Sequence, residues 1–84
     1  MIYIVTEIQT NTDNTVAVLT NNFTDRQDAE SKYHYVLSFA AKSTLPVHAV
    51  SIQTNEGQVI EYKYYKHAQP EPEPESNEDV IING

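Results

Sequence analysis

The N-terminal part of the chain alternates its side chains with a period of two, which is the pattern of β-strands. Residues 2–10 predict a first strand, with Ile2, Ile4 and Ile8 on one face and the odd-numbered side chains on the other. Residues 11–14 (Asn-Thr-Asp-Asn) predict a tight turn, because such short polar side chains hydrogen-bond to the nearby backbone. Residues 15–20 should therefore return as a second strand, which the asparagine pair at 21–22 should end.

A helix should follow this second strand. Thr24 fits a capping box with Gln27, in which the threonine hydroxyl accepts from the amide three residues on and the glutamine side chain reaches back. Apolar residues then recur at intervals of three and four, as expected of a helix with one face on a sheet. The predicted stripe is Ala29, Tyr33, Val36, Leu37 and Ala40. The helix should end near Lys42, because a cation suits the negative end of the helix dipole.

Residues 47–54 and 58–65 predict a second hairpin. The turn between them contains Gly57, which can supply the positive φ that a short hairpin turn with a bulge requires. The element order is therefore β-β-α-β-β. We expect an α+β fold in which one helix packs across a small antiparallel sheet of about four strands.

The register of this second hairpin decides which side chains meet the helix. If Thr54 lies opposite Gln58, then Val50 lies opposite Tyr62 on an apolar face, which should receive the helix. The other face should then be the wet one.

Residues 67–84 differ in composition from the chain before them. Prolines at 70, 72 and 74 alternate with glutamates, and this segment should be extended because proline lacks a backbone donor and the carboxylates repel one another. We therefore expect one small domain over residues 1–66 and an acidic tail over residues 67–84. The tail ends in an apolar tip, Val80, Ile81 and Ile82, which could add a strand to a sheet edge. The alternative is a solubilising arm that orders only in an assembly.

The net charge of −7 is concentrated in the tail, which carries five of the twelve carboxylates and no cation. The body has seven acidic and five basic residues, so it lacks the clustered cations that grip a nucleic-acid backbone, and we expect no duplex nucleic acid as partner. No apolar run approaches the ~20 residues of a membrane helix, and the N-terminus does not read as a signal peptide. A cytoplasmic location is expected, with the virion as the alternative.

The small body has no cysteine, which excludes disulfides and thiolate metal sites. Domains of this size without a covalent or metal staple often gain stability by association. We therefore expect a homo-oligomer, with a dimer as the first guess.

Two groups of side chains are candidates for binding. Tyr35 and Phe39 lie four residues apart, away from the main helix stripe and beside Lys32. They could form a subunit interface, a stacking platform for a base, or the edge of the core.

The second group lies in the only locally basic and aromatic stretch of the chain, residues 62–67. Lys63, Tyr65 and Lys66 could stack a nucleotide and pair with its phosphate. The alternative is an ordinary edge strand, in which tyrosine is frequent and lysine prevents aggregation.

Catalytic constellations are not recognisable. His34, His48 and His67 lack metal-ligand spacing, and with glycine only at positions 57 and 84 there is no glycine-rich phosphate loop. No nucleophile motif accompanies the serines. We predict no metal, no cofactor and no enzymatic activity.

Three segments carry a resemblance. The run at residues 25–34 (DRQDAESKYH), the run at 45–50 (LPVHAV) and the YKYYKH strand at 62–67 with its Pro-Glu tail resemble short proteins encoded by phages and prophages of gut bacteria. The resemblance spans nearly the whole chain but carries no catalytic or binding motif, so it implies a context and no site. In that context, small acidic cytosolic proteins act as antagonists of bacterial defence or as minor virion components.

From the residues alone we expect a small oligomeric binding module. With the resemblance, the hypothesis is a phage accessory protein that binds a host protein or sequesters a nucleotide signal. Its alternative is a minor structural protein of the virion.

Overall fold

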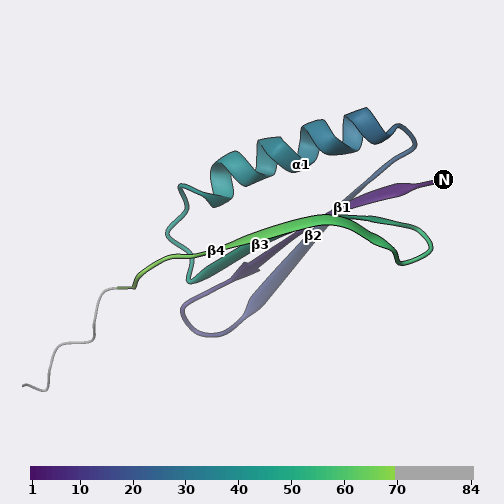
Figure 1. The fold of residues 1–84 in the computed structure, drawn as a ribbon. Coiled ribbons are helices and arrows are strands. Elements are labelled where there is room, and N and C mark those ends of the chain that lie inside the picture. Colours follow the sequence, from purple (N-terminus) through teal and green to yellow (C-terminus); the bar gives the residue numbers. More distant parts are fainter. Residues whose placement is uncertain (70–84) are drawn as a thin grey trace, which may run out of the picture.

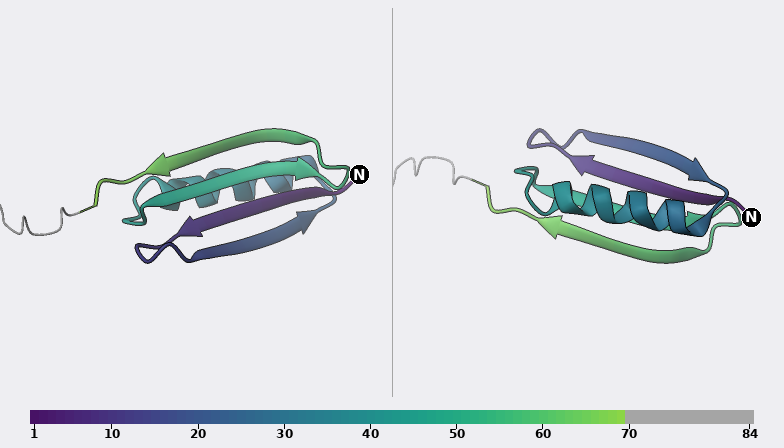
Figure 2. Two further views of the ribbon diagram at one scale, coloured as in Figure 1. Left: turned by 90° about the horizontal axis from the view of Figure 1, so that it is seen from below. Right: turned by 90° about the horizontal axis from the view of Figure 1, so that it is seen from above.

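Four strands and one helix make up residues 1–69, the part of the chain that the computed structural model describes (Figure 1). The elements are β1 (Tyr3–Thr10), β2 (Val16–Phe23), α1 (Arg26–Ala40), β3 (Val47–Thr54) and β4 (Val59–Lys66). The strands form one antiparallel sheet in the order β2-β1-β3-β4, and α1 lies across one side of it, over β1 and β3 (Figure 2). The predicted α+β fold is confirmed.

The core lies between α1 and the sheet. Its buried apolar side chains come from α1 and the two central strands: Val5, Ala29, Tyr33, Val36, Ala40, Val50 and Ile52. The predicted helix stripe is confirmed, with Leu37 partly buried at its margin. Complete burial of one large apolar side chain contributes about 1.5–3 kcal/mol, so this single layer provides most of the hydrophobic stabilisation of the described residues.

The helix begins one residue later than the capping box predicts. Asp25 is the N-cap, and its Oδ1 accepts a hydrogen bond from the Gln27 amide at 2.8 Å. The predicted Thr24 cap is wrong, because Asp25 already holds the extended backbone that a cap needs (φ −111°, ψ 125°). At the other end α1 stops at Ala40, and Lys42 lies in the turn beyond it.

The second strand is longer than predicted. Asn21 and Asn22 do not end it, because they pair with Val5 and Ile4 and β2 continues to Phe23. Asparagine has a low β propensity, but on an edge strand the backbone pairing with β1 decides and the exposed amides remain hydrated. The predicted break is wrong for this reason.

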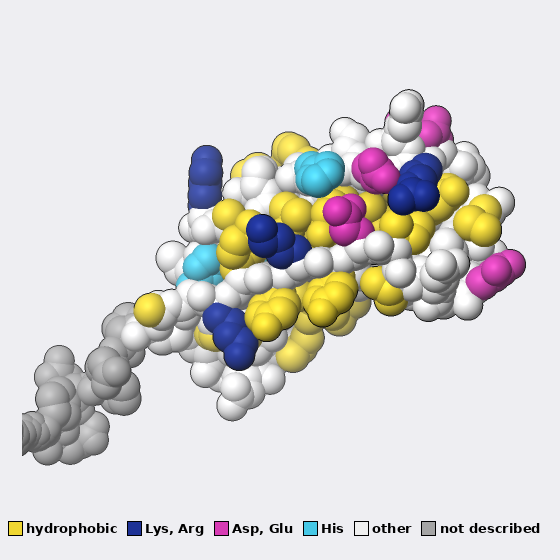
Figure 3. Space-filling view, in the orientation of Figure 1, with side chains coloured by type: hydrophobic (Ala, Val, Ile, Leu, Met, Phe, Trp, Pro, Cys, Tyr) yellow, Lys and Arg dark blue, Asp and Glu magenta, His cyan; other side chains and the backbone are white. Residues whose placement is uncertain are grey.

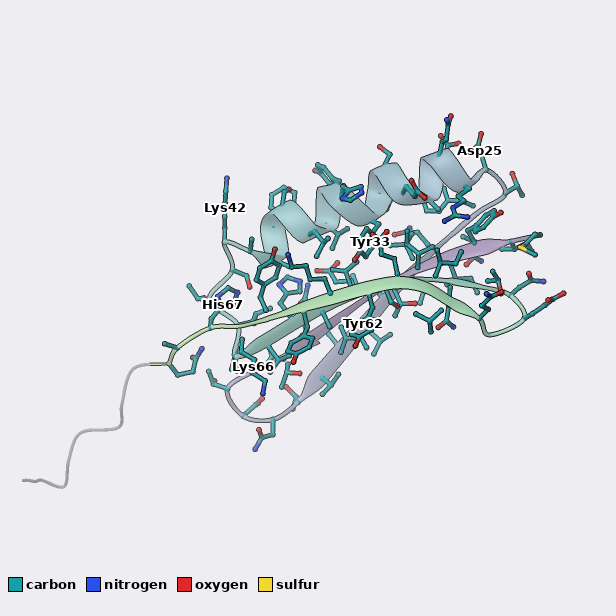
Figure 4. All side chains as sticks on the ribbon, viewed as in Figure 1. Asp25, Tyr33, Lys42, Tyr62, Lys66 and His67 are labelled. Atoms are coloured by element: carbon teal, nitrogen blue, oxygen red, sulfur yellow. The ribbon has the colours of Figure 1, made fainter. Side chains whose placement is uncertain are left out.

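A β-bulge changes the register between β3 and β4. The turn is as predicted, with Gly57 at φ 90°. The register then shifts at Ile52/Gln53, so that Val50 lies opposite Lys63 and not opposite Tyr62. The predicted register is therefore wrong beyond this point. Tyr62, expected in the core, is 68% exposed and points away from α1 (Figure 4).

The chain stays in contact with the body a little beyond β4. The His67 amide donates to the Pro46 carbonyl at 3.1 Å, and its Nε2 donates to the Ala40 carbonyl at 2.8 Å. The Gln69 side chain reaches the Thr44 carbonyl at 3.1 Å. The tail was expected to begin at His67, and these contacts attach its first residues to the loop after α1.

The predicted docking tip, Val80, Ile81 and Ile82, lies outside the described residues. Within residues 1–69, no helix has the length and apolar character needed to cross a membrane.

Candidate binding surfaces

A polar cluster lies on the helix side of the sheet, at the end of α1. His48 of β3 is buried, with Nε2 2.6 Å from Glu7 Oε2 on β1 and Nδ1 2.9 Å from Ser43 Oγ in the loop after α1. Gln9 donates from Nε2 to the same Glu7 oxygen at 2.7 Å. Gln9 and His48 are cross-strand partners, so the β1–β3 register assembles this cluster.

The charge of Glu7 is stabilised in place. Burial alone raises the pKa of its carboxyl, but hydrogen bonds from Gln9 and His48, with electrostatic attraction to His48 and Lys32, hold the net pKa below its ordinary value. The ionised form of Glu7 is therefore favoured over the protonated form at the point where β1, β3 and the loop after α1 meet.

Ser43, His48 and Glu7 are the residue types of a hydrolase triad, but here a substrate cannot reach the histidine. Both ring nitrogens of His48 are occupied and only 3% of the residue is exposed, so no nitrogen is free to take a proton from a substrate. The cluster ties three segments together.

Sequence reasoning missed this cluster, because Glu7 and His48 are 41 residues apart and the strand order was unknown. The sequence did contain a signal for it: Glu7 in β1 and His48 in β3 are polar residues that interrupt the apolar side of their strands.

The first candidate surface is an aromatic patch on one flank of α1. The rings of Tyr35 and Phe39 meet edge to face, with centroids 5.0 Å apart, and Lys32 Nζ lies 5.5 Å from the centre of the Tyr35 ring. Both aromatic residues are more than half exposed.

This flank faces the β1–β2 side of the sheet. The charge of Lys32 acts on Glu7, whose cross-strand partner on β2 is the half-exposed Leu19. We call Leu19, Lys32, Tyr35 and Phe39 the helix-flank patch.

The remaining predicted binding residues lie at the opposite edge of the sheet. Lys63 Nζ is 5.4 Å from the centre of the half-buried Tyr65 ring, and both residues are on the helix side of β4. Lys66 follows on the other side of the strand and points away from α1 (Figure 4).

Tyr33 of α1 belongs to neither group, because it is buried in the core. Burial, together with nearby Glu61 and Tyr65, raises the pKa of its hydroxyl. The structure therefore brings together Lys32, Tyr35 and Phe39, and separately Lys63 and Tyr65, but it does not join the two groups into one site.

The second candidate surface is the side of the sheet away from α1, which we call the open sheet face. It consists of the even-numbered residues of β1 and β2, the odd-numbered residues of β3, and Val59, Tyr62, Tyr64 and Lys66 of β4. Its exposed large apolar side chains are Ile8, Val16, Val18, Val59, Tyr62 and Tyr64. In Figure 3, hydrophobic side chains continue along the underside of β4. The sequence missed this surface because the bulge moves two tyrosines onto it.

Cavities and clusters of potential metal ligands are not found within residues 1–69. The chain matches no protein-family model, no curated protein and no solved structure.

Proposed function

We propose that the chain is a non-enzymatic binding module that engages another protein through the helix-flank patch. The observation that carries this proposal is the exposed Tyr35–Phe39 pair, with its rings held edge to face beside a lysine. Aromatic side chains with few rotatable bonds are favoured anchors in protein interfaces, because they bury a large area at a low cost in conformational entropy.

The geometry favours a protein over a nucleotide as the ligand of this patch. A nucleotide needs a stacking platform with cations within reach of its phosphate. Lys63 and Lys66, the cations expected for that task, lie on β4 at the far edge of the sheet from Tyr35 and Phe39. Lys32 alone remains, and it lies near Glu7. An apolar pocket with a carboxylate at its rim fits this set of groups better.

The buried cluster supports a role other than catalysis. Its histidine has both ring nitrogens occupied inside the body, so the one Ser-His-carboxylate grouping described above links structural elements. The resemblance to phage-encoded proteins suggests the setting. There the module is an accessory protein in the host cytosol that antagonises a bacterial defence protein, with a minor structural role in the virion as the alternative.

The test is quantitative capture from phage-infected bacterial cells. Wild-type protein, Tyr35→Ala/Phe39→Ala and the control Tyr62→Ala/Tyr64→Ala serve as baits, and bound proteins are compared by mass spectrometry. We expect a host protein that is retained by the wild type and the control but lost with the flank variant. Equal capture by all three baits would refute the role of the patch.

Two further measurements separate the alternatives. Calorimetry against cyclic and linear nucleotides should give no heat. Binding of any of them would show that a nucleotide is a ligand of the chain and would contradict the proposal that the ligand is a protein. Co-purification of the chain with phage particles would instead support the structural role.

A further inference from the structure

The side chains of the open sheet face form four rows that run across the sheet. The outermost row is Val16, Thr10, Val47 and Lys66, and the next is Val18, Ile8, Ala49 and Tyr64. The third row is Thr20, Thr6, Ser51 and Tyr62, and the fourth is Asn22, Ile4, Gln53 and Val59. Six of the eleven exposed large hydrophobic residues among residues 1–69 lie on this one face.

Among residues 1–69, which include seven carboxylates, none of the acidic side chains lies on this face. The described acidic residues lie on the helix side of the sheet, in the two hairpin turns, or on and beside α1: Glu7, Asp13, Asp25, Asp28, Glu30, Glu56 and Glu61. Lys66 is the one charged residue among the four rows. Depletion of charge over an apolar surface is the compositional mark of an interface core.

We propose that the open sheet face binds a second copy of this chain, so that two sheets pack face to face with a helix on each outer side. The seven acidic groups of residues 1–69 lie elsewhere, so those of two copies do not face one another across this surface. The proposed partner for the helix-flank patch does not compete, since that patch is on the other side of the sheet. This inference is therefore independent of the function proposed above.

The area is sufficient for a specific dimer. Strands about 4.8 Å apart that rise about 3.4 Å per residue give a face of four eight-residue strands a footprint of roughly 500 Å². Two such faces remove on the order of 1,000 Å² from water, which is the lower limit for a specific interface, and the relief of the side chains adds to it.

Complementarity of size selects the arrangement of the two copies. Large side chains occupy the β4 side of the face and small ones the β2 side, as Tyr64 and Val18 show within one row. A two-fold axis parallel to the strands, between β1 and β3, places Tyr64 of one copy near Val18 of the other, and Ala49 near Ile8. Large side chains then meet small ones across the interface, as dense packing of two sheets requires.

The first test compares two double variants that add the same charge on opposite sides of the sheet. Val18→Lys/Tyr64→Lys modifies the open sheet face, and Leu19→Lys/Tyr35→Lys modifies the helix-flank patch. All four side chains are about half exposed or more in the single chain, and Val18 and Leu19 are neighbours on one strand. Sedimentation velocity over a concentration series reports the dissociation constant.

We expect a dimer for the wild type and the flank variant, and a dissociation constant raised on the order of 100-fold for the open-face variant, because it buries unpaired charges. A wild type that stays monomeric at high micromolar concentration would overturn the proposal. So would an open-face variant that dimerises as the wild type does. The flank variant should at the same time lose the captured host protein, so that failure of either proposal is recognised separately.

The second test works even if the charged variant does not fold. The chain has no cysteine, so single cysteines can be placed at will. Mixed Val18→Cys and Tyr64→Cys chains, treated with a short bismaleimide, should give a heterodimeric cross-link in preference to either homodimer. Cross-linking no stronger than for a mixture of Leu19→Cys and Tyr35→Cys chains would overturn the face-to-face arrangement.

Discussion

The face of the sheet under α1 and the open sheet face are built from the same four strands, but their side chains meet water very differently. Under α1, Val5, Val50 and Ile52 are at most 2% exposed. On the open sheet face, Val18 and Tyr62 are more than half exposed. One helix can cover only one of two apolar faces. The comparison shows that the covered face forms the core of the single chain, whereas the open one exposes its apolar side chains to solvent.

The largest expected effect is on the covered face. Tyr33→Ala should lower the free energy of unfolding by about 3–5 kcal/mol, because it removes a fully buried aromatic ring from the core. Tyr62→Ala, on the open sheet face, should change it by no more than about 0.5 kcal/mol in dilute solution. Urea denaturation followed by circular dichroism measures both. Similar losses in the free energy of unfolding for the two variants would show that the two faces contribute alike to the stability of the single chain.

The next effect concerns the polar cluster at the margin of the covered face. Glu7→Gln should cost about 1.5–3 kcal/mol, because it replaces a charged acceptor of two hydrogen bonds by a neutral one. The same substitution at Glu56, exposed in the β3–β4 turn, is the matched control and should be nearly neutral.

The pH dependence of stability sharpens this prediction. The pKa of Glu7 is lowered in the folded chain from its ordinary value of 4.5, so the unfolded chain binds the proton more readily. The stabilisation is complete above pH 4.5 and is lost as the pH falls through the lowered pKa of the folded state. Glu7→Gln should therefore show a shallower acid decline in stability than the wild type, and identical slopes would contradict the assignment.

A smaller effect should appear at the start of α1. Asp25→Ala should destabilise the chain by about 1 kcal/mol, because the Gln27 amide loses its acceptor. Thr24→Ala, at the position that the capping box selects, should cost clearly less. Thermal unfolding of the two variants compares the two positions. A larger loss of stability for Thr24→Ala would show that Thr24, as in the predicted capping box, is the cap.

The smallest of these effects lies where the chain leaves β4. His67→Ala should cost about 0.5–1.5 kcal/mol, because it removes the side-chain hydrogen bond to the Ala40 carbonyl and the stacking on Tyr65. Lys66→Ala, one residue earlier on the open sheet face, serves as the control. Denaturation curves that coincide for the two variants would show that His67 contributes nothing to the body.

The sequence predicted the elements better than their register. Local signals were sufficient for the helix stripe around Tyr33 and for the turn at Gly57. The bulge at Ile52/Gln53 was not predicted, and it moved Tyr62 from the expected core to the opposite side of the sheet. The adjacent apolar pairs in β4, at 59–60 and 64–65, are incompatible with strict alternation and were the available sign of an irregular strand.

The candidate surfaces were only partly predictable for the same reason. The helical part of the helix-flank patch follows from helical spacing, so Lys32, Tyr35 and Phe39 could be grouped from the sequence, whereas Leu19 of β2 could not. The open sheet face and the Glu7–His48 contact depend on strand order, which the pattern of side chains does not determine.

The strand order also bears on how the chain folds. Each hairpin joins neighbours in the sequence, but β1 and β3 pair across separations of 37 to 51 residues, from Thr10↔Val47 to Tyr3↔Thr54. Closing so long a loop costs entropy before any contact repays it, so the joining of the two hairpins should limit the folding rate. During synthesis, α1 emerges before β3, the strand that completes the sheet surface on which the helix packs. Until residues 47–54 have left the ribosome, the apolar stripe of α1 can be covered by the first hairpin alone, without Val50 and Ile52.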